Sequence, residues 1–271
     1  MRLVIAEKKS VATAIAQALC AAPVQKDGCY ECGQLLVTWA QGHLIDLAMP
    51  EDYKDRDWGK WSLDTLPVDP SGHWQWKIST ERGAGSRYRQ IVQLIRRADV
   101  DCLVNACDPD REGEAIFRRI ADMEGSRKPE LRLWVASLEA EAIQAAWRAM
   151  KPESEYRGLA WSAEIRSKAD WLTGMNASRA YSLLYNARFS VGRVQTPTLA
   201  MIAERDRQIR SHKPVPFWTV IADMGGWRLS SERIDSKDAA MLLRGQVERG
   251  RFRIMSVSRK RVNDRPPACM T

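Results

Sequence analysis

The stretch Cys102–Glu114 decides the fold, because an apolar run, Cys-Leu-Val-Asn-Ala-Cys, leads directly into Asp-Pro-Asp-Arg-Glu-Gly-Glu. The apolar half is typical of a buried strand in a parallel sheet. The residues after it place Ile116, Ile120 and Met123 on one helical face, which predicts a helix. The acidic run therefore lies at the carboxyl end of a strand, where open α/β sheets bind their ligands.

The acidic run needs a cation, because four carboxylates within seven residues repel one another. A further acid follows the apolar run Leu3–Ala6, and neighbouring parallel strands would bring both to one edge of the sheet. Oxygen ligands at short spacing favour Mg²⁺, which keeps several waters and usually also contacts phosphate. We therefore expect a magnesium site made by the acids at these strand ends: Glu7, Asp108, Asp110 and Glu112.

Two other interpretations of these acids stay open. Glu7 can instead keep a proton and protonate a leaving alkoxide, since crowding by like charges raises the pKa of a carboxyl group. The run can also be a solvated acidic loop, which is how most clusters of Asp and Glu behave.

Composition narrows the class of protein. The 271 residues suffice for a sizeable core and more than one domain. The net charge of +8 suggests an acidic partner, most simply nucleic acid. Apolar runs long enough to span a membrane are missing from the sequence, and Glu7-Lys8-Lys9 argues against a signal peptide. The six cysteines lack a second pair at zinc spacing, and we expect thiols in a reducing cytoplasm.

The pattern along the chain predicts three parts. Strands and helices alternate over residues 1–152, which predicts an α/β fold with a parallel sheet flanked by helices. Residues 153–213 read as a mainly helical region, with a long helix over 156–187, a kink at Gly174 and a second helix from Thr196. Residues 214–271 read as a β-rich segment with short strands at Trp218–Asp223 and Phe252–Val257 and a helix near 236–244.

Other polar and aromatic residues are candidates for binding a nucleic-acid strand. Lys8 follows Glu7 at the start of a helix and can meet a phosphate there. Arg166 and Asp170 lie one helical turn apart and form either a surface ion pair or a backbone contact in a cleft. The turn at 190–195 can grip phosphates, because its glycine permits close backbone approach. The remaining candidates are His43, Trp61 as a base-stacking residue, and the turn residues Ser190, Val191, Gly192, Arg193, Val194 and Gln195.

These segments together resemble a known family. Leu3–Lys8, Gln41–Leu44 and Asp108–Glu114 resemble a Toprim domain. Ala169–Ala180 and Ser190–Leu199 resemble the region that follows it in type IA DNA topoisomerases, the topoisomerase III branch in particular.

The resemblance implies a reaction and its participants. One DNA strand is cut through a 5′-phosphotyrosine bond, another strand passes, and the cut is resealed without ATP or another nucleotide cofactor. In the whole enzyme this relaxes negative supercoils and decatenates DNA. By motif position Glu7, Asp108 and Asp110 would hold Mg²⁺ with support from Glu112, and Lys8 would contact the scissile phosphate. The partner would be single-stranded DNA, and the protein a cytoplasmic, nucleoid-associated monomer.

One departure from the family concerns the nucleophile. The family's tyrosine follows the Gly-Arg-Val-Gln turn, whereas the tyrosines here lie at 30, 53, 88, 156, 181 and 185, all before that turn. We interpret Tyr181 and Tyr185 as packing residues of the long helix. We therefore expect an N-terminal portion that does not cleave DNA alone. The alternatives are a non-catalytic module that binds single-stranded DNA and a Toprim nuclease that hydrolyses DNA with metal-bound water.

Overall fold

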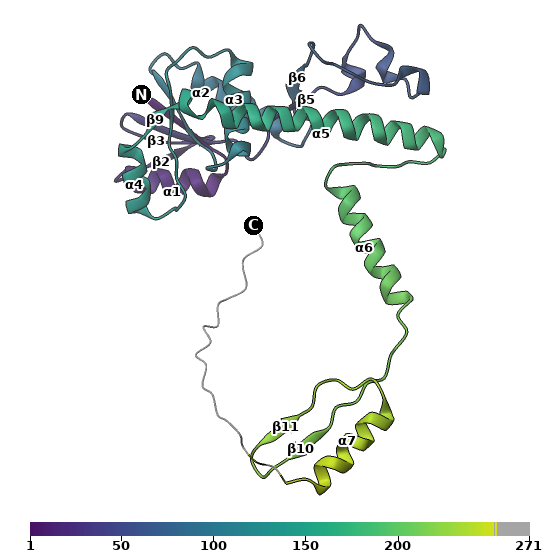
Figure 1. Cartoon of the computed structure of the whole chain (residues 1–271). Helices are drawn as coiled ribbons and strands as arrows, with labels where there is room; N and C mark the ends of the chain where they lie inside the picture. The colour runs from purple at the N-terminus through teal and green to yellow at the C-terminus, as the bar shows by residue number, and fades with distance from the viewer. Residues whose placement is uncertain (252, 254–271) are drawn as a thin grey trace. The chain divides into compact units, whose positions relative to one another are not determined.

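The computed structural model describes residues 1–251 and residue 253. Its contacts divide the chain into two compact units, Met1–Met201 and Ile202–Thr271. Figure 1 labels the α-helices of both units and several of their strands.

The first unit is built on a seven-stranded sheet with the order β2-β3-β4-β1-β7-β8-β9. The four central strands are parallel, which confirms the expected parallel sheet, and antiparallel strands extend it at both edges. In sheet order the strands are Val24–Lys26 (β2), Cys29–Cys32 (β3), Leu35–Trp39 (β4), Arg2–Ala6 (β1), Cys102–Ala106 (β7), Glu130–Arg132 (β8) and Lys151–Pro152 (β9).

The central strand β1 explains where the site forms. Ala6 pairs with Trp39 of β4 on one side and with Ala106 of β7 on the other, so three strands end at one level. Glu7 is the first residue after β1, and Asp108 is the second residue after β7. The register therefore brings these two carboxylates to neighbouring positions at the edge of the sheet.

Helices cover both faces of this sheet. Leu3 and Ile5 belong to one core cluster, and Val4 and Ala6 to the other, because successive side chains of a strand point to opposite faces. All four are fully buried, as a continuous apolar run in a parallel sheet predicts. The first cluster includes residues of α2 (Ala84–Ile95) and α3 (Arg111–Glu124), and the second residues of α1 (Lys9–Leu19) and α4 (Ala140–Arg148).

The long helix α5 (Arg157–Leu184) packs against α3 and continues without a break through Gly174, so the expected kink is absent. The loops between β5 (Ile45–Leu47) and β6 (Trp76–Ile78) also contact α5 (Figure 1). Asn176 accepts a hydrogen bond from the Val68 amide at 2.6 Å and donates to the Val68 carbonyl at 2.9 Å. Three short 3-10 helices order this insertion: Pro50–Asp52 (η1), Asp57–Gly59 (η2) and Leu63–Thr65 (η3).

The second unit is small in its described part. Helix α6 (Gln195–Arg210) crosses the boundary between the units, and a hairpin of β10 (Ile221–Asp223) and β11 (Arg228–Ser230) precedes α7 (Lys237–Arg249). The expected strand and helix of this segment are present with shifted ends. The strand expected at Phe252–Val257 lies outside the described residues, apart from residue 253.

The cysteines differ from the sequence expectation. Cys20 and Cys32 form a disulfide, with Cα atoms 6.2 Å apart, whereas we expected thiols throughout. Cys29 and Cys107 are buried free thiols, and Cys102 is a half-buried one. Among the described residues, none of the helices is both long enough and apolar enough to cross a membrane.

Candidate active site at the strand ends

The carboxylates of Glu7 and Asp108 converge on one cation. The Lys8 ammonium lies 3.0 Å from Glu7 Oε1 and 3.2 Å from Asp108 Oδ2, and these contacts raise the pKa of Lys8, with Glu7 the larger cause. Glu7 is mostly buried, whereas Lys8 and Asp108 are open to solvent. The edge of the sheet therefore presents two adjacent carboxylates and a charged ammonium to an incoming group.

Gly113 fixes the shape of the acidic loop. A β-carbon at this position would lie 2.1 Å from the Asp108 carbonyl oxygen and 2.8 Å from the Asp108 amide nitrogen, so only glycine fits. Asp110 is the N-cap of α3, and its Oδ1 accepts a hydrogen bond from the Gly113 amide at 2.8 Å. The turn from Asp108 into α3 is thus set by two features of the motif itself.

A buried arginine, Arg132, binds the backbone of the acidic loop. Arg132 is 1% exposed, and it donates to the carbonyl oxygens of Cys107 at 2.9 Å and Asp108 at 2.8 Å. Its Nε lies 2.5 Å from Glu114, which is fully buried. Because an unpaired buried charge is costly, this pair must be kept intact. Arg132 thereby ties the backbone that carries Asp108 to the core.

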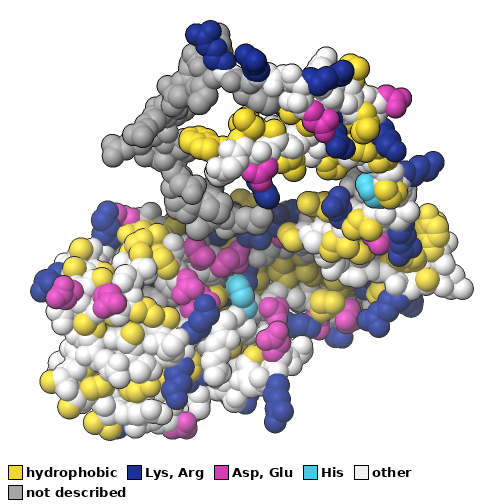
Figure 2. Space-filling view, turned by 90° about the horizontal axis from the view of Figure 1, so that it is seen from below, with side chains coloured by type: hydrophobic (Ala, Val, Ile, Leu, Met, Phe, Trp, Pro, Cys, Tyr) yellow, Lys and Arg dark blue, Asp and Glu magenta, His cyan; other side chains and the backbone are white. Residues whose placement is uncertain are grey.

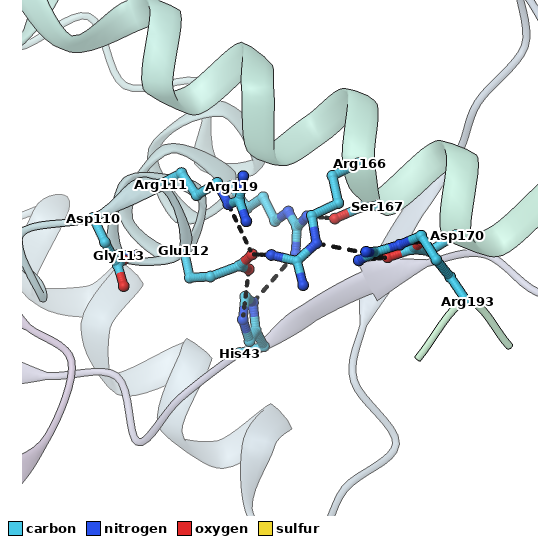
Figure 3. A network of polar contacts seen from close by, with 10 residues as sticks. All are labelled: His43, Asp110, Arg111, Glu112, Gly113, Arg119, Arg166, Ser167, Asp170 and Arg193. Atoms are coloured by element: carbon cyan, nitrogen blue, oxygen red, sulfur yellow. Dashed lines mark hydrogen bonds and ion pairs between the residues drawn. The ribbon is translucent and has the colours of Figure 1, made fainter. Parts of the chain in front are cut away.

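Glu112 belongs to a different contact set from Asp108. Its carboxylate lies 2.9 Å from Arg166 Nη1 of α5 and 3.8 Å from His43 Nε2. Arg119 contacts His43 Nδ1 at 3.2 Å and donates to Ser167 at 2.7 Å. Figure 3 shows these side chains meeting between α3 and α5, with Asp110 pointing away from them.

His43 lies between an acid and an arginine. Burial lowers the pKa of His43, the Arg119 charge lowers it further, and the charge of Glu112 opposes both. These causes together favour the neutral imidazole, which can accept a hydrogen bond from Arg119.

The polar network continues from α5 to the turn at 190–195. Arg166 Nε lies 3.7 Å from Asp170, and Asp170 accepts hydrogen bonds from Arg193 Nε at 2.5 Å and Nη2 at 3.1 Å. Arg193 holds the pKa of Asp170 below its ordinary value. Glu112, Arg166, Asp170 and Arg193 therefore form one continuous chain of opposite charges (Figure 3).

Two serines of α5 form hydrogen bonds to the returning segment, residues 189–191, which follows this helix. Ser178 Oγ accepts from the Val191 amide at 2.9 Å and donates to its carbonyl at 3.3 Å. Ser182 does the same for Phe189, at 2.9 Å and 3.2 Å. The turn itself is closed by hydrogen bonds from Gln195 to Ser190 at 2.7 Å and from the Gly192 amide to Thr196 at 3.0 Å.

The aromatic candidate Trp61 and the tyrosines of the long helix lie in other contact sets. Trp61 is 53% exposed, and the guanidinium of Arg179 lies 5.2 Å from its ring centroid. Tyr181 and Tyr185 stack on one another, as expected of packing residues of the long helix, but at its surface, since they are 48% and 66% exposed.

The carboxylates at the strand ends meet part of what Mg²⁺ requires. Glu7 and Asp108 supply two neighbouring carboxylates, which suits an ion that uses one or two carboxylates together with water and phosphate. Asp110 and Glu112 do not converge on the same point, since one caps α3 and the other pairs with Arg166. Across residues 1–251 and 253, no three His, Cys, Asp or Glu side chains form a metal-binding group. The fit therefore rests on Glu7 and Asp108.

Sequence reasoning missed the residues that support the site. Asn105 donates hydrogen bonds to both Glu114 and Glu153 at 3.0 Å, and its place within an apolar strand was a usable signal. Arg119 and Ser167 carried no signal, because their contacts depend on how α5 packs against α3. Arg132 carried no signal either, because arginine is mostly exposed in proteins and its burial depends on the tertiary fold.

Comparison with known proteins agrees with this geometry. A family model described as Toprim domain matches residues 2–138, and one described as DNA topoisomerase matches residues 154–271. DNA topoisomerase 3 of Bacillus subtilis (strain 168) is 38% identical over 235 residues, which are 87% of this chain and 32% of that protein. DNA topoisomerase 3 of Staphylococcus aureus (strain MRSA252) is 34% identical over 267 residues, which are 97% of this chain and 37% of that protein.

The fold is also found in a solved structure. Full-length topoisomerase I from Thermotoga maritima matches with a TM-score of 0.58 at 18% identity, covering 89% of this chain and 37% of that one. The chain thus spans about a third of the length of the relatives that it matches. Because the Toprim and topoisomerase models follow one another along nearly its whole length, the chain belongs to the type IA DNA topoisomerase family.

Proposed function

We propose that this chain supplies the metal-binding and strand-binding half of a topoisomerase III centre. The observation that carries the proposal is the Lys8 ammonium between Glu7 and Asp108, at the ends of two adjacent parallel strands. A phosphodiester needs a cation for its charge and a donor for its oxygens, and this edge of the sheet offers ligands for the first and Lys8 for the second. Lys8 thus contacts the scissile phosphate.

Mg²⁺ would be held by Glu7 and Asp108, with Asp110 and Glu112 as the further carboxylates of the site. When bound there, the ion would neutralise phosphodiester charge and orient its oxygens. Glu112 is fixed by Arg166, so it contributes first by keeping α5 close to the strand ends. Asp110 contributes by setting the start of α3.

The DNA strand would run from the strand ends along α5 to the turn at 190–195. Arg193 is exposed and Arg166 partly so, and each shares Asp170 as a counter-charge that a phosphate can replace. The assigned contact residues are His43, Trp61, Arg166, Asp170, Ser190, Val191, Gly192, Arg193, Val194 and Gln195. They suit a single strand, because a tryptophan can stack only on a base that is unpaired.

The activity of the whole protein follows from its family. It would cut one DNA strand, pass another and reseal the cut, relaxing negative supercoils and decatenating DNA, without a nucleotide cofactor and as a monomer. None of the six tyrosines of the chain follows the Gly-Arg-Val-Gln turn, so the nucleophile must come from outside these 271 residues. The chain alone should therefore bind Mg²⁺ and single-stranded DNA without cleaving.

Calorimetric titration with MgCl₂ tests the metal assignment. Binding should be lost in Asp108→Asn and Glu7→Gln and kept in the control Asp101→Asn, an exposed acid at the other end of β7. Equal affinity in all four proteins would refute the assignment.

A plasmid assay on the purified chain tests the role. We expect neither relaxation nor a covalent DNA adduct, together with binding of a labelled oligonucleotide that weakens in Arg193→Ala. An adduct on this chain would overturn the proposal. Mg²⁺-dependent nicking that Asp108→Asn abolishes would instead identify a nuclease.

A further inference from the structure

A cavity of about 520 Å³ lies on the other side of Glu7 from Asp108. Its wall includes Trp39 and Gln41 at the end of β4, Lys9 at the start of α1 and the first turn of α2. The amides of Gln41 and Gly42 donate to the Glu7 carbonyl, at 2.8 Å and 3.3 Å, so this wall is joined directly to the candidate site. The network of Figure 3 includes none of the residues of this wall.

A buried cation without a counter-charge lines this cavity. Arg87 is 5% exposed, and its four hydrogen bonds go to neutral acceptors: the carbonyls of Trp39 and Gly28, Thr38 Oγ1 and Gln90 Oε1. Within the described part of the chain, no carboxylate forms an ion pair with Arg87. Desolvation lowers the pKa of Arg87 to about 10. Since a buried charge is costly unless it is compensated, an anion in this cavity would relieve the cost.

Neighbouring groups make the same side of the cavity electropositive. The Lys9 ammonium lies 5.6 Å from the Trp39 ring centroid, and the Arg87 guanidinium lies 4.3 Å from it. Trp39 is 6% exposed, and within the described structure its indole nitrogen has no hydrogen-bond partner. The lining also holds Lys26, which pairs with Glu31, and one acid, Asp27, close to the Gln90 amide. The amino end of α2 adds a partial positive charge.

We propose that this cavity binds a backbone phosphate of the same DNA strand, adjacent to the phosphate that Lys8 contacts. Lys9 donates hydrogen bonds to this phosphate, because it follows Lys8 directly and, among the described residues, has no acidic partner. Arg87 supplies the fixed positive charge, and Ser86 and Gln41 supply neutral donors at the rim. This inference rests on the proposed function, since the strand must already lie at Glu7 and Asp108.

Anisotropy with a labelled thymidine oligonucleotide of about ten nucleotides, in EDTA, tests the proposal. Lys9→Ala should weaken binding by about threefold or more and reduce the slope of log affinity against log salt by about one, as the loss of one phosphate contact predicts. Lys151→Ala, an exposed lysine on β9, serves as the matched control and should change neither quantity. Unchanged binding in Lys9→Ala would overturn the proposal.

Ser86→Asp provides a second variant that does not threaten the fold. An acid in the first turn of α2 favours the helix, so weaker DNA binding with an unchanged or raised melting temperature supports a phosphate at the cavity. Unchanged DNA binding in this variant would count against it. If Arg193→Ala weakens binding while both cavity variants do not, this inference fails and the proposed function stands. If wild-type protein does not bind the oligonucleotide, the proposed function fails.

Inorganic phosphate separates a strand site from a site for the free anion. Tryptophan fluorescence of the wild type is followed during phosphate addition with and without the oligonucleotide, with Lys9→Ala as reference. Competition between the two ligands supports the proposal. Phosphate binding that the oligonucleotide does not displace assigns the cavity to the free anion and overturns it.

Discussion

At Gly113 the backbone of Asp108 leaves no room for a β-carbon. Gly113→Ala would place that atom 2.1 Å from a carbonyl oxygen, and a backbone neighbour cannot yield as a flexible side chain does. We expect the free energy of unfolding to fall by about 1–3 kcal/mol, the range that is typical of overpacking. Urea denaturation measures it.

Gly158 is the matched control, because it also lies in the first turn of a helix, but a β-carbon there would have no atom within 4 Å. Gly158→Ala should stabilise the protein by up to ~1 kcal/mol through helix propensity. Equal effects of the two substitutions would contradict the steric reason for glycine in the motif.

Glu153 makes stability depend on pH. It is 6% exposed, and burial together with the nearby Glu114 raises its pKa from 4.5 to about 9. Between these values the folded state binds a proton that the unfolded state has released. Stability should therefore be greatest below pH 4.5 for this group and fall as the pH rises towards 9, by at most ~1.4 kcal/mol per pH unit.

Glu153→Gln mimics the protonated acid and should flatten this dependence, raising stability at pH 8 by at least ~1 kcal/mol. Thermal melts across pH 5–9 measure the slope. Glu155→Gln, an exposed acid two residues away, should leave the slope unchanged. An identical slope in Glu153→Gln and wild type would show that Glu153 is ionised when folded.

Helix α5 organises the turn at 190–195 through Ser178 and Ser182, one helical turn apart. Each binds both the amide and the carbonyl of a single residue in the returning segment, as a neighbouring strand would. The double substitution to alanine should remove about 1 kcal/mol per hydrogen bond lost. Amide exchange at Phe189 and Val191 should accelerate, whereas Ser211→Ala, just after α6, should leave both rates unchanged. Unchanged rates in the double variant would place the control of the turn in the Asp170–Arg193 pair.

The meeting of Glu7 and Asp108 was predictable from the sequence, because parallel strands that pair in register end together. The role of Asp110 as a cap was not, since a carboxylate can ligate or cap equally well until the backbone direction is known. The pairing of Glu112 with Arg166 joins residues 54 positions apart and depends on the packing of α5 against α3.

Helix propensity explains why the kink predicted at Gly174 is absent from α5. A lone glycine weakens a helix but does not bend it, and here a β-carbon would lie 3.4 Å from the Val191 carbonyl oxygen. The glycine therefore permits the returning segment to lie close to α5. The division at residues 152 and 213 remains a prediction.

At the scale of the whole molecule, charge is spread widely rather than gathered at the site. Figure 2 shows Lys and Arg side chains over the visible face, with acidic and apolar side chains between them. The net charge of +8 therefore favours DNA in general, and under the proposed function the alignment of the strand would depend on Arg166 and Arg193 near α5.

The two units should differ sharply in stability. In the described part of the second unit, Ala240 is the one apolar side chain that is buried, whereas Leu3, Val4 and Ile5 of β1 are fully buried. Stability follows buried apolar surface, so amides of β10 and β11 should exchange within seconds to minutes and those of β1 and β7 only through global unfolding. Hydrogen exchange followed by mass spectrometry measures both. Protection of β10 equal to that of β1 at high dilution would contradict this, and protection that disappears on dilution would instead identify self-association as its source.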